Sequence, residues 1–512
     1  MKPRILGLSA SLRNARSKAG ARRLVTELKG LGDRADLDRY LAEQAQIHLD
    51  QFVAAGRAEG LAFDELYRRL RAMGGQRGLS NSEICLVAAL WGARQEGAAI
   101  DHLPLADHFP ADGNPVALDR LKAALRAADG FVLSTPVYFG DRGSLSQRFI
   151  EMLRADTSLR ADLAGKVYGG LAVGAKRNGG QETTLIYQML DMLDVGLLGV
   201  GNDSETTSQY GGTGHAGDVG TMPKDTYGIN TSIGTGRRIA RVTSQLRTAR
   251  DSRLVDLPRV DLWVLQDRAG ALVGALAPLF GTVAEDAEIT VLDLLSEPIR
   301  PCIACDICPT KVGPDEEYRC IIKRRDDGVR NAHHDLLHAD VIVPAVLSPK
   351  HRDGLQSVYQ EFMERTRFLR RGDYVFTDRL VAPLVLAEVG ATEHLDVRMM
   401  TSMLRHHTVM IKPIVGLLRD GRLINPEDVA DGLAGAIAHG RRLLTGRLGS
   451  ISLEHSSTAY QPVGYVLAQA KDNEKETMTA REQATRQRLG RLADEARRRL
   501  ARVEGGSTAG AA

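Results

Sequence analysis

The sequence predicts an α/β protein made of two doubly wound parallel sheets in tandem, each with five strands. The chain has 512 residues, 43% of them hydrophobic, which is too long for one ordinary core. Short apolar runs alternate with helical patterns, as in a parallel sheet with helices on both faces. The pattern also recurs: 125–139 and 336–350 each run from a helix end through Ala-Asp into a buried strand and a proline-containing loop.

The strand candidates are short apolar runs separated by helical patterns. In the first half they lie at residues 4–9, 99–105, 130–135, 167–174 and 195–201. In the second half they lie at residues 260–266, 287–294, 340–346, 380–389 and 408–416. Each half therefore predicts one small doubly wound sheet, and the two halves together indicate an internal duplication.

Composition shifts divide the chain further. The first domain covers residues 1–242, with a helical insertion at about 18–78 that contains no strand pattern. A polar linker at 243–259 leads to a second domain at 260–450. The extension 451–512 contains an amphipathic helix near 489–503 and a tail expected to be disordered. That helix is expected to pack on its own domain or on a second subunit; a membrane-surface helix is the alternative.

The charge balance excludes several classes of partner. Lys and Arg total 67 against 64 Asp and Glu, so a net charge of +3 gives no long-range field for nucleic acid or anionic membrane. No run of about 18 apolar residues occurs, and the N-terminal stretch turns polar early. We expect a cytoplasmic protein whose partner is a small molecule or a redox protein, and the sequence is compatible with a homo-oligomer.

The loop after the first strand has the composition of a phosphate cradle. It offers small hydroxyl residues that allow close backbone approach, and an arginine that can grip a phosphate with two donors; the candidates are Ser9, Ser11, Arg13 and Ser17. The loop lacks the GxxxxGK[ST] and GxGxxG spacings, so a monophosphate such as that of FMN suits it better than a triphosphate or a dinucleotide.

Two further loops would lie at the same edge of the sheet, where open parallel sheets bind ligands. The loop after the third strand could receive a flat ring through Pro136, Val137, Tyr138, Phe139 and Gly140. The loop after the fourth strand offers amide and glycine groups for the rim of a flavin at Arg177, Asn178, Gly179, Gly180 and Gln181. The alternative is that all of these are ordinary turn residues.

The motifs SLRNARS, SNSEICLVAALWGARQEGA, ADGFVLSTPVYFG and AKRNGGQETT resemble the NADPH-dependent FMN reductases of flavodoxin-like fold, in particular the iron-sulfur flavoproteins among them. The resemblance covers most of residues 1–242. It implies that Ser11, Arg13 and Ser82 bind the FMN phosphate, that 136–140 face the isoalloxazine, and that 178–181 line its edge. In the family the phosphate loop leads directly into a helix that opens like 80–83. Here the insertion intervenes, so either Ser17 or Ser80 and Ser82 complete the phosphate site.

The glycine-rich stretch 199–220 is expected to form a mobile loop over the flavin ring. Tyr210 and His215 within it are candidate proton donors, although solvated side chains are the plainer interpretation.

Four of the five cysteines form the second candidate site. Cys302, Cys305, Cys308 and Cys320 supply the four thiolates that a 4Fe-4S cluster requires, in a CxxCxxC pattern with a longer final gap. The pattern resembles that of the iron-sulfur flavoproteins. A four-cysteine zinc site and a site without metal are the alternatives. Cys85 lies in a helical pattern and is expected to be a buried structural thiol.

The second domain departs from the family at its flavin loops. Its first strand is followed by 266–270, which has no hydroxyl cradle and carries Asp267, and 347–351 replaces the aromatic loop. We therefore expect one FMN in the first domain and the cluster in the second, arranged like the two members of a family dimer. The expected function is an FMN oxidoreductase that takes electrons from NAD(P)H and couples FMN to the cluster. The alternatives are an electron-transfer protein serving a partner enzyme, and a flavin reductase with structural zinc.

Overall fold

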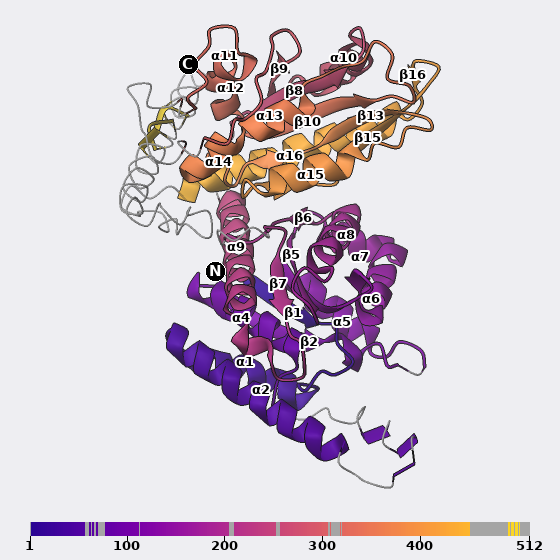
Figure 1. The fold of residues 1–512 in the computed structure, drawn as a ribbon, viewed down its shortest axis with the longest axis vertical. Coiled ribbons are helices and arrows are strands. Elements are labelled where there is room, and N and C mark those ends of the chain that lie inside the picture. The colour runs from indigo at the N-terminus through magenta and orange to yellow at the C-terminus, as the bar shows by residue number, and fades with distance from the viewer. Residues whose placement is uncertain are drawn as a thin grey trace, which may run out of the picture. The chain divides into compact units, whose positions relative to one another are not determined.

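The computed structural model describes residues 2–56, 77–111, 113–203, 209–251, 256–305 and 320–450, with isolated residues between these ranges and within 490–501. The chain divides into two compact units, Met1–Ser244 and Gln245–Ala512 (Figure 1). The predicted linker 243–259 begins inside helix α9 (Thr226–Asp251) and ends at the start of strand β8 (Arg259–Asp267).

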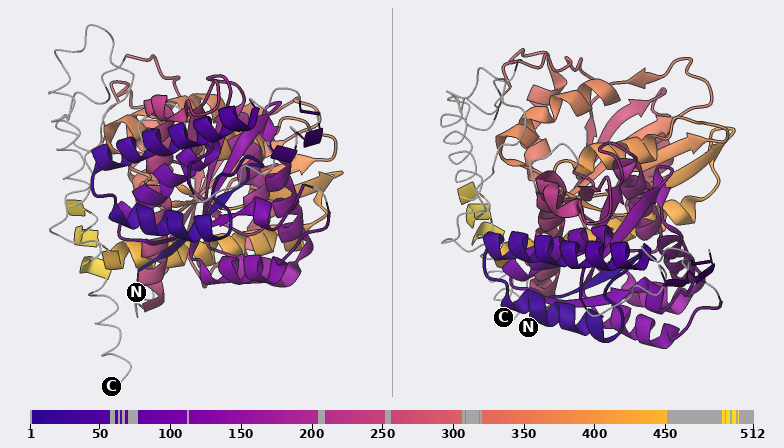
Figure 2. Two further views of the ribbon diagram at one scale, coloured as in Figure 1. Left: turned by 90° about the horizontal axis from the view of Figure 1, so that it is seen from below. Right: turned by 60° about the horizontal axis from the view of Figure 1, so that its bottom comes forward.

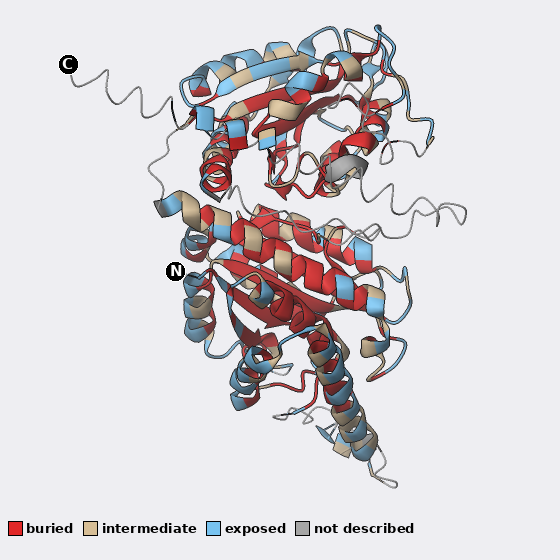
Figure 3. Cartoon of the chain, turned by 90° about the vertical axis from the view of Figure 1, so that its left-hand side faces the viewer, coloured by how far each residue is buried: buried red, intermediate tan, exposed pale blue. Residues whose placement is uncertain are grey.

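Unit 1 contains a parallel sheet with the strand order β6-β5-β3-β1-β2. Its members are β1 (Arg4–Ser9), β2 (Ala99–Pro104), β3 (Gly130–Tyr138), β5 (Val167–Gly174) and β6 (Leu198–Gly199). Strand β7 (Gly212–His215), which the sequence reading missed, also pairs in parallel with β5. The two-residue β4 (Asp141–Arg142) folds back on β3. The central strands are mostly buried (Figure 3), which explains their continuous apolar sequences.

Two neighbouring glycines of β5 show that helices cover both faces of this sheet. A Cβ on Gly169 would meet Ile239 of α9 at 2.7 Å, whereas one on Gly170 would meet Leu185 of α8 (Gln181–Asp194) at 3.0 Å. Consecutive residues of a strand point to opposite faces, so α9 and α8 lie on opposite sides. Helix α4 (Asn81–Gln95) shares the α9 side, since a Cβ on Gly236 would lie 1.8 Å from the carbonyl oxygen of Ala89.

Three further helices share the α8 side and bury apolar side chains there: α5 (Leu118–Ala127), α6 (Ser144–Ala155) and α7 (Thr157–Leu163). Short 3₁₀ turns lie at η1 (Leu105–Asp107) and η2 (Met222–Lys224). The predicted insertion contains α1 (Ala19–Gly30) and α2 (Arg34–Gly56), drawn in indigo next to one another in Figure 2. Most of the remaining insertion, 57–76, lies outside the described residues.

Unit 2 contains a second sheet in which β8 lies between β9 (Glu288–Asp293) and β10 (Val341–Ser348), all parallel. Strands β12 (Leu380–Val381) and β13 (Leu384–Glu388) both pair with β10. Strand β14 (Val409–Met410) pairs with β12, and β15 (Ile414–Arg419) pairs with β13. Each predicted strand, 380–389 and 408–416, is thus split in two. The split falls at Pro383 and Pro413, because proline has no N–H to donate to the ladder.

Two short strands pair antiparallel at the margins of this sheet: β11 (Gln356–Ser357) with β8, and β16 (Arg422–Leu423) with β15. The helices of unit 2 are α10 (Ala271–Val283), α11 (Gly328–Asn331), α12 (His333–His338), α13 (Tyr359–Arg365), α14 (Arg367–Asp373), α15 (Leu395–Leu404) and α16 (Pro426–Ser450). Trp263 of β8 is fully buried and packs against Phe362 and Phe376, with ring centroids 5.3 and 5.6 Å away.

The C-terminal extension is described only in part. Residues 451–489 and 502–512 lie outside the described residues, and those described within 490–501 are helical, where the sequence predicts a helix. Across the part of the chain that the structure describes, no helix combines the length and apolarity needed to cross a bilayer.

Candidate functional site

Three loops of unit 1 leave the sheet at the same edge. They follow β1, β3 and β5, which are adjacent parallel strands, so their carboxyl ends meet there. This is the edge at which open α/β sheets bind ligands. The structure therefore brings together the three loops that carry the predicted flavin-binding residues.

Glu83, which the sequence reading missed, organises the loop after β1. Its side chain is fully buried in the first turn of α4 and accepts hydrogen bonds from the backbone amides of Ala15 (2.8 Å) and Arg16 (3.0 Å). It also accepts from the amide (2.9 Å) and hydroxyl (2.8 Å) of Ser80, which completes a capping box. Burial raises the pKa of Glu83, against these hydrogen bonds. The Ser-x-x-Glu spacing at 80–83 was a readable signal for this role.

Two of the predicted phosphate-binding residues, Ser9 and Ser80, form hydrogen bonds within the protein. The hydroxyl of Ser9 accepts from Asn14 Nδ2 (2.8 Å) and lies 3.2 Å from His102 Nε2. Burial, and then the charge of Arg16, lower the pKa of His102 to about 3, so this imidazole is neutral. The Ser80 hydroxyl belongs to the capping box. These side chains shape the loop from within.

The remaining phosphate candidates are Arg13, Ser11, Ser82 and Ser17, which differ in exposure. Arg13 is exposed, and the backbone amide of Arg13 donates to Ser11 Oγ at 3.1 Å. Ser82 is buried in the first turn of α4, and Ser17 is half-buried. An α-helix leaves its first-turn amides without intrahelical acceptors, and these favour an anion. The α4 amides together with the Arg13 guanidinium are therefore the groups whose chemistry fits a phosphate.

The loops after β3 and β5 touch through two glycines. A Cβ on Gly180, whose φ is +100°, would lie 2.5 Å from the Cα of Gly140. Strand β3 extends through Tyr138, so the predicted loop begins later than expected; Tyr138 and the following Phe139 have exposed fractions of 60% and 107%. Pro136 and Val137 behind them are half-buried. Exposed aromatic and apolar groups beside a closely packed glycine turn fit the flat face of a flavin.

Two predicted rim residues have their side chains engaged elsewhere. Arg177 forms an ion pair with Asp225, donates to the carbonyl of Thr213 (3.1 Å) and stacks on Tyr227. Gln181 is buried and donates to the carbonyls of Lys176 (2.7 Å) and Gly214 (3.1 Å). Both side chains fix the loop, so only the backbone of 178–180 remains as its candidate ligand-binding part; Asn178 has a φ of +59°.

The stretch 199–220, expected to be a mobile loop, contains strand β7 instead, although 204–208 lie outside the described residues. His215 ends β7 opposite Gly174, and its backbone amide donates to Asp225 Oδ2 at 2.7 Å. Its side chain is half-buried, as is Tyr210. The backbone pairing of β7 with β5 holds His215 at the same edge of the sheet as the three loops.

The four cysteines of unit 2 differ in exposure: Cys302 and Cys305 are half-buried, whereas Cys308 and Cys320 are buried. Four thiols are the correct donor set for a 4Fe-4S cluster or a structural zinc. Within the described residues, however, no three Cys, His, Asp or Glu side chains are grouped so as to hold a metal. Residues 306, 307, 309–317 and 319 of this segment lie outside the described residues.

One buried ion pair ties the two ends of the cysteine segment together. Arg365 of α13 pairs with Asp327 (2.7 Å), and both side chains are almost fully buried. The same guanidinium donates to the carbonyl of Arg300 (2.9 Å) and to the hydroxyl of Tyr318 (2.6 Å). These residues lie just before Cys302 and Cys320, so Arg365 holds both cysteine-bearing ends to α13.

The loop after β8 in unit 2 holds its own anion. Asp267 Oδ1 accepts from the backbone amides of Arg268 (2.6 Å) and Leu272 (2.9 Å), at the start of α10. The Arg268 side chain pairs with Glu388. The carboxylate thus occupies the amides that a phosphate would need.

Similarity to known proteins is concentrated in unit 1. Residues 69–201 match the family model of NADPH-dependent FMN reductases, beginning beyond α1 and α2. An iron-sulfur flavoprotein of Methanocaldococcus jannaschii is 34% identical over 130 residues, which are 25% of this chain and 66% of that protein. An NAD(P)H dehydrogenase (quinone) of Caulobacter vibrioides is 29% identical over 183 residues, 32% of this chain and 92% of that one.

A solved structure of a WrbA-like flavodoxin from Agrobacterium tumefaciens is 23% identical and covers 32% of this chain and 90% of its own. Its TM-score of 0.25 is too low to support an argument about the fold. The chain spans 66% of the length of the M. jannaschii flavoprotein, just under two thirds. The expected resemblance is confirmed: residues 69–201, which include two of the three site loops, match the family model of the NADPH-dependent FMN reductases.

Proposed function

We propose that the chain is an FMN-dependent oxidoreductase that binds one FMN at the three-loop edge of unit 1 and takes electrons from NAD(P)H. The carrying observation is that the loops after β1, β3 and β5 meet at one edge, and that the last two of these loops lie within residues 69–201, which match the FMN reductase family. Bound FMN would accept a hydride and supply the redox chemistry, while the protein binds and orients it.

The contacts assign a role to each loop. The Arg13 guanidinium and the first-turn amides of α4 would hold the phosphate, with Ser11 and Ser82 beside them. Tyr138 and Phe139 would cover the ring. The backbone of 178–180 would bond its polar rim. His215 ends β7 at this edge, and its imidazole would be the proton donor.

The acceptor class is proposed from relatives. Several are named NAD(P)H dehydrogenase (quinone), and the one from Caulobacter vibrioides is aligned over 92% of its length. A quinone is flat and apolar, which suits a site flanked by exposed aromatic side chains. We therefore propose quinones as the acceptors to test first.

Unit 2 is proposed to be a second, diverged copy of the same fold that carries a four-cysteine metal site coupled to the flavin. The support is the parallel order of its strands about β8 and β10, the CxxCxxC spacing, and the clamp of Arg365 on both ends of that segment. A 4Fe-4S cluster fits the four thiols, and relatives of this chain are named iron-sulfur flavoproteins.

The test is an anaerobic visible and paramagnetic resonance spectrum of the purified chain before and after NADPH. We expect flavin bands that bleach on reduction, and a broad iron-sulfur absorbance. Cys305→Ser should remove the iron-sulfur signal and leave the flavin bands unchanged. Absence of flavin would overturn the assignment of unit 1. A four-cysteine site that holds zinc, or no metal, would overturn only the assignment of an iron-sulfur cluster to unit 2.

A further inference from the structure

Arg16 is a fully buried cation of unit 1, and it lies in the loop after β1. Its side chain has no exposed surface. Nη2 donates to Glu27 Oε2 of α1 (2.7 Å), and to Tyr40 Oη (3.3 Å) and Gln44 Oε1 (2.8 Å) of α2. Nε donates to the carbonyl of Gly78 at 3.0 Å. One loop side chain therefore bonds to α1, to α2 and to the far end of the insertion.

The partners of Arg16 also bind one another. Tyr40 donates to the same Glu27 oxygen at 2.6 Å, and Gln44 Oε1 accepts from the amide of Gly78 at 2.9 Å. The carbonyl of Gln44 accepts from the amide of Leu79 at 3.1 Å. A buried guanidinium that loses its acceptors costs several kcal/mol. The buried position of Arg16 consequently requires α1 and α2 to be docked on the loop.

A second contact joins the insertion to the loop independently. The guanidinium of Arg13, the loop's exposed cation, lies 5.4 Å from the ring centroid of Phe52 in α2. This is the range of a cation–π contact, which orients a guanidinium without neutralising it. The insertion therefore positions the residue that fits the phosphate best.

The opposite side of the loop is fixed by α4, because Glu83 binds the backbone amides of Ala15 and Arg16. The loop is thus held between the first turn of α4 and the docked pair α1 and α2. Without the insertion's acceptors, the Arg16 side chain could not keep this position, and the amides beside it would shift.

We propose that the helical insertion is a working part of the flavin site, and that Arg16 couples binding of a flavin phosphate to docking of α1 and α2. This rests on the proposed function, because it takes FMN to bind in unit 1. Coupling between two events is reciprocal. Docked helices raise the affinity for the phosphate, and the phosphate stabilises the docked helices. Arg16 acts here as a positioning residue that does not touch the ligand.

The test compares FMN with riboflavin, which has the same ring and ribityl chain and no phosphate. Affinities are measured by flavin fluorescence quenching on the apo form of the full chain. Arg16→Met should weaken FMN binding by about tenfold, a change of about 1.4 kcal/mol, and riboflavin binding by less than about twofold. Arg16→Lys keeps the charge but has fewer hydrogen-bond donors. Its FMN affinity should fall between those of Arg16→Met and the wild type.

Milder variants keep the test valid if Arg16→Met does not fold. Tyr40→Phe and Gln44→Met each remove one acceptor and leave the buried guanidinium with others. Each should lower FMN affinity by a few-fold and spare riboflavin. Arg39→Met is the matched control, since Arg39 lies on α2 with 72% of its side chain exposed and pairs only with neighbouring Asp36 among the contacts described. It should change neither affinity.

The reciprocal effect is measured by amide hydrogen exchange. FMN should slow exchange in 19–30 and 34–56 of the wild type, and riboflavin should not. Equal losses for both ligands would overturn the proposal, since they indicate a general folding role. Unchanged FMN affinity in Arg16→Met, Tyr40→Phe and Gln44→Met alike would also overturn it. A wild-type chain that binds neither flavin contradicts the proposed function instead.

Discussion

Asp261 of β8 is a buried carboxyl group within the sheet of unit 2. Burial, and then repulsion from Asp335, raise its pKa to about 7, although Arg379 acts in the opposite direction. In the unfolded chain an aspartate has a pKa of about 4. The folded state therefore holds the proton more tightly, and stability is lost as pH rises from about 4 through about 7.

Asp261→Asn should abolish this loss, because an amide stays neutral. Thermal unfolding of the full chain should show little difference between variant and wild type near pH 4. A higher Tm for the variant is expected at pH 8, by about 2–4 °C for each kcal/mol recovered. Asp420→Asn, at an exposed turn, serves as the control. The same Tm difference at both pH values would refute the prediction.

Gly180 packs against Gly140, where the loops after β3 and β5 meet. An added methyl group would strain a φ of +100° and collide with Gly140. Gly97 has a similar φ of +83° and nothing within 4 Å of its Cβ position. Gly97→Ala should cost about 1–2 kcal/mol of unfolding free energy from φ alone. Gly180→Ala should cost about 1–3 kcal/mol more, from overpacking. Equal losses in denaturant unfolding would show that the loops separate easily.

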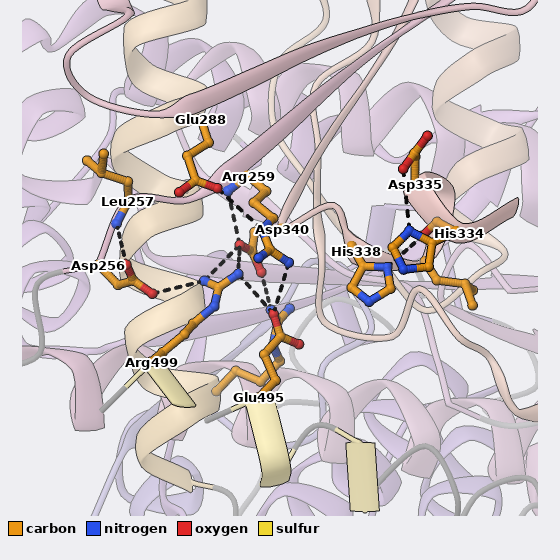
Figure 4. Close-up of polar contacts among 12 residues, drawn as sticks. Asp256, Leu257, Arg259, Glu288, His334, Asp335, His338, Asp340, Glu495 and Arg499 are labelled. Carbon is orange, nitrogen blue, oxygen red and sulfur yellow. Dashed lines mark hydrogen bonds and ion pairs between the residues drawn. The ribbon is translucent and has the colours of Figure 1, made fainter. Parts of the chain in front are cut away.

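At the scale of elements, Asp340 joins segments that are distant in the sequence of unit 2 (Figure 4). It precedes β10, and its Oδ2 accepts from the amide of Arg259 in β8 (3.0 Å) and from Arg499 near the C-terminus (3.1 Å). Oδ1 pairs with Arg447 of α16. Burial alone would raise the pKa of Asp340, but Arg447, Arg499 and Arg379 together lower it.

A lowered pKa means that stability is present above about pH 4 and is lost as pH falls through the folded value. Asp340→Asn should destabilise the chain by about 3–5 kcal/mol at pH 7, since it leaves buried arginines without their counter-charge. Denaturant unfolding at pH 7 and at pH 3 would measure this, and the difference should shrink at pH 3. Glu495→Gln, which removes a half-buried partner of Arg499 and Arg259, should cost far less.

The elements themselves were largely readable from sequence, and their interruptions have a local cause. Each strand candidate of unit 1 overlaps an observed strand, because buried parallel strands are continuous apolar runs. Strand β7 was missed because Gly212–His215 contains two glycines and no apolar run, and its β-structure depends on pairing with β5. Local pattern cannot reveal a strand that exists only through its neighbour.

At the scale of the whole molecule, the two units predict a flavin content of one per chain. Asp267 already occupies the loop amides of unit 2, whereas the loop of unit 1 has an exposed arginine and a helix N-terminus. Flavin released by denaturation should therefore equal one FMN for each 55.6 kDa chain. Asp267→Asn should leave this value at one. Two FMN per chain would show that unit 2 also binds flavin.

The sequence by itself determined the α/β class, the positions of most strands, the three loops and the four cysteines. These depend on local pattern: apolar runs, turn residues and motif spacing. The tertiary structure alone decided what each residue in the loops does. Ser9, Ser80, Arg177 and Gln181 were expected to face the ligand, but their side chains bond within the protein. Arg16 and Glu83 were not expected to matter, and they hold the phosphate loop. The reason is physical: a buried polar group takes the nearest available partner, and only the folded chain determines which partner that is.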